Sequence, residues 1–111
     1  MSPLSARLAA GALALVALMP GASAGDGAPP PAERQDALLH MLRHDCGACH
    51  GLTLKGGLGP PLLADRLGAV SNQALVSVIL DGVPGTPMPP WRPALTEAEA
   101  AWLVARLKRG L

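Results

Sequence analysis

Apolar residues recur at helical spacing in three segments of the chain. In the first, residues 33–45, Leu38, Leu39 and Leu42 share one side of a helix and charged side chains occupy the others. We expect a helix here that runs into Cys46.

The last apolar segment has the clearest start signal. Thr96 and Glu99 form a capping box, in which each side chain bonds a free amide group of the first turn. Basic residues gather near the C-terminus, where the helix dipole favours cations. We expect a helix over 96–109 whose core face consists of Ala100, Leu103, Val104, Leu107 and Leu111.

A third helix is expected between these two, and glycine and proline interrupt the chain on either side of it. Residues 72–81 are mostly apolar, with Ser71 as a good N-cap and Gly82 as a C-terminal stop. Residues 51–61 contain four glycines and two prolines, and residues 82–91 contain two glycines and four prolines, so both are expected to be loops. No segment shows the alternation of a strand, which predicts an all-α domain of about three main helices.

The N-terminus has the pattern of a secretory signal. Arg7 precedes a short apolar run, and Ala22-Ser23-Ala24 fits the small-residue pattern of a cleavage site. The run is shorter than the roughly 20 residues that a bilayer span requires. We therefore expect an exported protein with no stable membrane insertion after cleavage. Its predicted parts are a signal peptide over 1–24, a proline-rich linker over 25–32 and one domain over 33–111.

Net charge and composition bear on the kind of partner and on what fills the core. Removing Arg7 from the nine basic residues leaves eight, which equals the eight acidic residues. This neutral balance argues against a nucleic-acid partner. The chain has no Phe and no Tyr, and its aromatic residues are Trp91 and Trp102. Because aromatic side chains usually dominate a small core, we infer that a large apolar group from outside the sequence fills the centre.

Both cysteines lie in the motif Cys46-x-x-Cys49-His50. A redox dithiol normally follows a strand, and no strand is expected here. Structural zinc needs about four ligands, and no second Cys or His pair exists. A local disulfide, or two free thiols, would leave His50 unexplained. The motif therefore favours covalent attachment of one haem c through both sulfurs, with His50 as the proximal iron ligand.

A haem iron in an electron carrier often takes Met as its second axial ligand. Met1 and Met19 fall in the predicted signal peptide, and Met41 lies on the first predicted helix. Met88 has proline on both sides, so it is expected on a stiff extended loop, which is poor core material. We predict His50 and Met88 as the iron ligands of an electron carrier that is not an enzyme. The alternative is a haem protein whose labile Met88 opens a site for sensing or catalysis.

The three motifs CGACHG, GLGPPL and TPMPPW occur in the order found in class I cytochromes c, and residues 34–111 resemble that family. The resemblance implies a haem-bearing helical domain in which the first and last helices cross, with Trp102 near their contact. It also implies that a carbonyl of the Gly-Pro loop, at Pro60, accepts a hydrogen bond from His50. Leu42 stands where many members have Phe or Tyr, so we expect a looser or shifted helix contact.

Two longer stretches look like the NirC-type cytochromes associated with dissimilatory nitrite reductase clusters. They are CHGLTLKGGLGPPLL and ILDGVPGTPMPPWRPALTEAEAAWL. This resemblance implies a periplasmic monohaem carrier in denitrification. Its redox partner would be cytochrome cd1 nitrite reductase or an enzyme of haem d1 maturation.

Five side chains have weaker claims to a role. Buried Trp usually finds a hydrogen-bond acceptor, so Trp91, with its neighbour Arg92, is a candidate to bind a haem propionate. Lys55 lies near the attachment motif and is a candidate for a docking surface. His40 and His44 are four positions apart on the first helix, where a solvated helix face is the favoured interpretation and a surface metal site the alternative.

Overall fold

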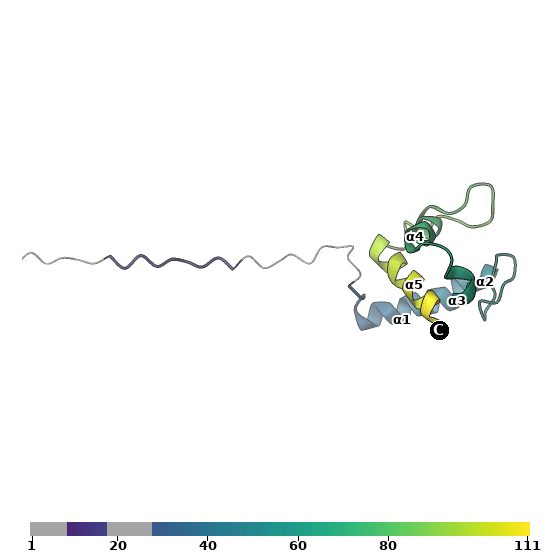
Figure 1. Cartoon of the computed structure of the whole chain (residues 1–111), viewed down its shortest axis with the longest axis horizontal. Coiled ribbons are helices and arrows are strands. Elements are labelled where there is room, and N and C mark those ends of the chain that lie inside the picture. Colours follow the sequence, from purple (N-terminus) through teal and green to yellow (C-terminus); the bar gives the residue numbers. More distant parts are fainter. Residues whose placement is uncertain (1–8, 18–27) are drawn as a thin grey trace, which may run out of the picture.

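The computed structural model describes residues 9–17 and 28–111 (Figure 1). Arg7 and the predicted cleavage site at Ala22-Ser23-Ala24 lie outside the described residues. Residues 9–17 are exposed and form neither helix nor strand. None of the helices in the described part of the chain is long and apolar enough to cross a membrane.

The domain begins with one continuous helical run in three parts. These are α1 (Ala32–Met41), the π-helical turn η1 (Leu42–Cys46) and α2 (Gly47–His50). The predicted first helix is confirmed, but the helical run continues past Cys46 to His50. In η1 the Gly47 N–H donates to the Leu42 carbonyl, five residues back. Such turns are often found at functional sites, and this one directly precedes the rest of the cysteine–histidine motif.

Three further helices complete the domain: α3 (Ala64–Leu67), α4 (Asn72–Asp81) and α5 (Glu97–Arg109). The predicted ends of α4 are confirmed. The Ser71 hydroxyl accepts a hydrogen bond from the Ala74 N–H at 3.2 Å, and Gly82 ends the helix with φ of 67°. The described residues contain no strand, so the predicted all-α fold is also confirmed.

The predicted capping box of α5 is present. Thr96 Oγ1 accepts from the Glu99 N–H at 3.1 Å, and Glu99 Oε1 accepts from the Thr96 N–H at 3.0 Å. The prediction that Leu111 belongs to the core face is wrong, because its side chain is 53% exposed. Gly110 has φ of 84°, so the chain leaves the helix before Leu111 can join that face.

The core is entirely aliphatic. Helix α5 packs against α4, α3 and α1, and its buried face lies at the centre. An ion pair between Arg34 and Glu99 joins α1 to the first turn of α5. Trp91 and Trp102 are half-buried and only pack against this core from outside. Its buried members are Leu38, Leu42, Leu54, Leu67, Val76, Leu80, Leu95, Ala100, Leu103, Val104 and Leu107.

Candidate cofactor site

The two cysteines lie on the continuous helical run, Cys46 at the end of η1 and Cys49 in α2. Both are half-buried free thiols, and Cys46 packs against the core. Burial raises the pKa of the Cys46 thiol to about 11, and the charge of Asp45 adds to the shift. Redox dithiols depend on a lowered cysteine pKa. The environment of Cys46 is therefore the opposite of the one a dithiol oxidoreductase needs.

The ring of His50 is held at one of its two nitrogens. His50 Nδ1 lies 2.7 Å from the carbonyl oxygen of Pro60. A carbonyl can only accept, so Nδ1 carries the proton and donates this hydrogen bond. In the neutral ring, the other nitrogen, Nε2, then has a free lone pair, and this is the form of imidazole that binds a metal. The structure thus contains the hydrogen bond between His50 and Pro60 that the resemblance to class I cytochromes c implies.

The loop 51–61 is folded tightly back onto α2. The Gly56 N–H donates to the His50 carbonyl, and the Gly59 N–H donates to the Cys49 carbonyl, both at 2.8 Å. A Cβ atom at Gly59 would lie 2.8 Å from Cε1 and Nδ1 of His50. The lack of a side chain at Gly59 therefore leaves room for the imidazole. Sequence reasoning predicted a loop here and, through the resemblance, the bond from His50 to Pro60, but it did not single out Gly59.

Met88 lies in a loop whose backbone is fixed by its own hydrogen bonds. The Met88 N–H donates to Thr86 Oγ1 at 3.3 Å, and the Met88 carbonyl accepts from the Val83 N–H at 3.2 Å. Thr86 Oγ1 also donates to the Val83 carbonyl at 2.7 Å. The Met88 side chain is half-buried and lines an open depression of about 410 Å³. The bridging role of Thr86 was missed, although Thr is a common local hydrogen-bonding residue in turns.

Both ends of this loop are tied to the C-terminal turn of α4. The Trp91 N–H donates to the Ile79 carbonyl at 3.0 Å, and the Arg92 N–H donates to the Leu80 carbonyl at 3.2 Å. Arg92 Nε also donates to Asp81 Oδ1 at 2.7 Å, and this hydrogen bond lowers the pKa of Asp81. The partner of Arg92 in the structure is thus Asp81, which sequence reasoning did not single out. Trp91, the other propionate candidate, is half-buried at the end of the loop.

The residues present fit a haem c group. Figure 1 shows the Met88 loop and the loop after α2 projecting from the same side of the helices. The donor set is two thiols, an imidazole with a free nitrogen and a thioether, and these are the groups that hold haem in cytochromes c. The entirely aliphatic core agrees with an aromatic group supplied from outside the chain. When bound, haem c supplies an iron that changes between two oxidation states.

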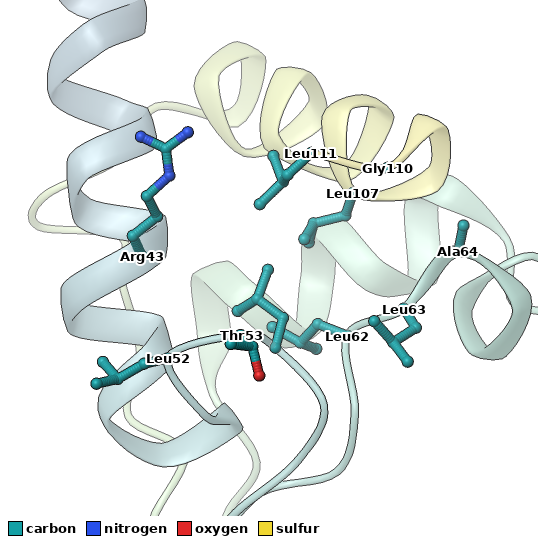
Figure 2. A pocket seen from close by; sticks show the side chains of 10 residues that line it. Arg43, Leu52, Thr53, Leu62, Leu63, Ala64, Leu107, Gly110 and Leu111 are labelled. Atoms are coloured by element: carbon teal, nitrogen blue, oxygen red, sulfur yellow. The ribbon is translucent and has the colours of Figure 1, made fainter.

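A larger hollow of about 550 Å³ lies among other side chains of the domain (Figure 2). It is enclosed by the helical run at Arg43, the segment 52–64 and the end of α5. Its lining is mostly leucine, and Figure 2 shows Leu107 of α5 and Leu111, just after that helix, facing it. Cys46, Cys49, His50 and Met88 are not among the residues that line it.

The chain is similar to several known proteins. Residues 33–105 match the family described as cytochrome c oxidase, cbb3-type, subunit III. The chain is 54% identical over 92 residues to cytochrome c55X of Paracoccus denitrificans (strain Pd 1222), which covers 83% of this chain and 86% of that protein. The solved structure of the c-type cytochrome NirC is 51% identical with a TM-score of 0.72, covering 73% of this chain and 95% of NirC.

A larger protein contains a similar domain. The solved dihydro-heme d1 dehydrogenase NirN is 38% identical with a TM-score of 0.58, over 63% of this chain and 15% of NirN. Together with the helical fold and the cysteine–histidine motif, these similarities define an electron-carrying c-type cytochrome of class I. The chain belongs to the NirC-type family of small cytochromes, the cytochrome c55X proteins. The family predicted from the sequence is thereby confirmed.

Proposed function

We propose that this chain is a periplasmic carrier of single electrons with one haem c. In this proposal Cys46 and Cys49 form the two thioether bonds, and His50 and Met88 are the axial ligands. The observation that carries it is the hydrogen bond from His50 Nδ1 to Pro60, because it leaves Nε2 free for the iron. Two bound ligands leave no position for substrate, so the protein acts as a carrier and not as an enzyme.

The Met88 loop supports the same proposal. Its internal hydrogen bonds and its ties to α4 hold Met88 in place from both sides. A ligand on such a loop loses little conformational freedom on binding, which favours a permanently ligated iron over a labile one. Trp91 is proposed to contact the haem at the end of this loop, with its indole N–H directed to a propionate.

The proposed organisation includes export. Residues 1–24 are a signal peptide, residues 25–32 a linker and residues 33–111 the cytochrome domain. The small residues Ala22-Ser23-Ala24 support cleavage after Ala24. Mass spectrometry of the periplasmic product tests this, and we expect an N-terminus at Gly25 and the added mass of one haem.

We also propose that the partner belongs to denitrification, as either cytochrome cd1 nitrite reductase or an enzyme of haem d1 maturation. The similarity to NirC and to the dihydro-heme d1 dehydrogenase NirN supports this assignment. Stopped-flow mixing of the reduced carrier with each oxidised candidate, and the reverse, separates the two. The physiological partner is expected to exchange electrons far faster, and equally slow exchange with both would refute the assignment.

Met88→Ala tests the axial ligand. A thioether ligand favours reduced iron, so its loss should lower the reduction potential of the haem by at least about 100 mV. This is a small part of the ~0.8 V range over which axial ligands set that potential. The charge-transfer band of Met-bound ferric haem should also disappear. Met41→Ala is the matched control and should leave both quantities unchanged. A Met88→Ala protein that keeps the band and the potential would refute this ligand.

Carbon monoxide distinguishes the carrier from a sensing or catalytic haem protein. The reduced wild-type protein should bind it slowly and incompletely at neutral pH, whereas Met88→Ala should bind it rapidly and stoichiometrically. Rapid stoichiometric binding by the wild type would instead support a labile Met88 and an open iron site.

A further inference from the structure

The rings of His40 and His44 form a close pair on the outer face of the helical run. Their centroids are 4.2 Å apart and their planes are tilted by 41°. Both side chains are exposed, and neither ring takes part in a hydrogen bond or ion pair among the described residues. The pair makes no contribution to the aliphatic core or to the donor set for haem. Its function is therefore not explained by the fold or by electron transfer.

The π-helical turn improves the alignment of these two rings. Each residue of an α-helix turns the chain by about 100°, so residues four apart are offset by about 40° around the axis. A π turn contains more residues per turn, so it reduces that offset. Here η1 begins at Leu42, between His40 and His44. The two imidazoles consequently lie close together on one side of the helical run, in a tilted arrangement.

This spacing suits chelation of one metal ion. Imidazole nitrogens bind Zn²⁺ at about 2.0–2.1 Å, so two nitrogens on one ion lie roughly 3 Å apart. The two rings lie 4.2 Å apart between centroids and both side chains are exposed, so each is free to rotate toward a shared ion. Imidazole prefers Zn²⁺, Cu²⁺ and Ni²⁺ over Mg²⁺ and Ca²⁺, which take oxygen ligands. No group of three or more His, Cys, Asp or Glu side chains that could hold a metal occurs within residues 9–17 and 28–111, so water must complete the coordination.

We propose that His40 and His44 form a surface site for one divalent transition-metal ion, with two imidazole ligands and water in the other positions. The site is separate from the haem ligands and does not require the proposed electron-transfer function. Its occupant is a borderline ion of the Zn²⁺ type, selected by nitrogen donors.

Calorimetric titration of the exported, haem-loaded and untagged protein with Zn²⁺ tests the site. We expect saturable binding of one Zn²⁺ per chain, no binding of Mg²⁺ at the same concentrations and no change in the haem absorption spectrum. His40→Gln and His44→Gln should each weaken Zn²⁺ binding at least about tenfold. Removing a residue that only supports a metal ligand already costs about tenfold in affinity, and these histidines are the proposed ligands themselves. Both side chains are exposed, so the variants should keep their haem content and unfolding midpoint.

Arg43→Gln is the matched control, because it changes an exposed charged side chain of the same turn. Zn²⁺ binding should change by less than about fivefold, the scale of one surface charge interaction. Three results would overturn the site: no saturable binding, equal affinity of the wild type and both histidine variants, or one ion per two chains. Equal affinity would place the ion on another group, such as a haem propionate.

Discussion

At the residue scale, the site depends on small residues as much as on the ligands. The ligand types could be predicted because Cys46, Cys49 and His50 are neighbours in the chain, and their spacing alone indicates the chemistry. Gly59 could not be assigned in this way. Its contact with the His50 ring exists only because the loop folds back over α2, and local spacing does not reveal that return.

Gly59→Ala should disturb the proximal side of the site. The added Cβ would lie 2.8 Å from His50 Nδ1, so the ring or the loop must move and the hydrogen bond to Pro60 must weaken. We expect the free energy of unfolding to fall by about 1–3 kcal/mol, as for other overpacked sites. Urea unfolding followed by haem absorption measures this loss.

Gly68→Ala provides the control for that experiment. Its new Cβ would lie 3.1 Å from the Ala64 carbonyl oxygen, a tight contact but milder than that at Gly59, and Gly68 has an ordinary helical φ of −58°. The control should unfold within about 0.5 kcal/mol of the wild type. If Gly59→Ala behaved like Gly68→Ala, the close contact with the imidazole would have no energetic role.

At the element scale, helices were predictable where the sequence marks their ends. Ser71 and Gly82 delimit α4, and the Thr96–Glu99 capping box starts α5. The π turn was not predictable, since no residue type specifies a shift from i+4 to i+5 bonding. The exposure of Leu111 was also missed. The apolar spacing continues through it, but the helix has already ended at Arg109.

Glu99→Gln should reduce the acid sensitivity of the fold. The Arg34 hydrogen bond lowers the pKa of Glu99 below its ordinary value of 4.5, and hydrogen bonds from Thr96 lower it further. A carboxyl with a lowered folded pKa stabilises the protein above its unfolded pKa, and this stabilisation is lost as pH falls through the folded value. Gln keeps the capping box but not the charge, so the cost at pH 7 should be about 0.5–1 kcal/mol.

The measurement is the free energy of unfolding in urea between pH 3 and pH 7. Below about pH 4.5, the wild type should lose stability more steeply than Glu99→Gln. Glu97→Gln is the control, because Glu97 is exposed in the same first turn and makes no side-chain hydrogen bond among the described residues. Equal acid slopes for the wild type and Glu99→Gln would show that the contact between α1 and α5 contributes nothing through this charge.

At the scale of the whole molecule, α5 packs against α1, α3 and α4, while the Met88 loop and the loop after α2 project from one side (Figure 1). The sequence predicted which segments are loops but not that they share a side, because that depends on how the helices cross. Leu58 is 75% exposed on one of these loops, and Lys55 is exposed on the same loop. An apolar surface beside a charge suits the brief contacts of an electron carrier.

Lys55→Glu should slow electron exchange with the redox partner at low ionic strength. Reversing a charge at the edge of a docking surface changes the association rate, and salt screens the effect. We expect a fall of about tenfold at 10 mM salt that largely disappears at 0.5 M, measured by stopped flow. Arg66→Glu makes the same charge change on α3, outside these loops, and should have a smaller effect. Similar rates for the wild type and Lys55→Glu at low salt would exclude Lys55 from the docking surface.

The loop between Asp81 and Arg92 leaves and rejoins the domain at a single turn of α4. We therefore expect residues 83–90 to behave as an insert, whose sequence can vary without changing the path of the helices around it. Exchanging this insert among relatives would give a series of proteins with a common frame and different surroundings for Met88. In such a family, the redox potential can evolve independently of the fold.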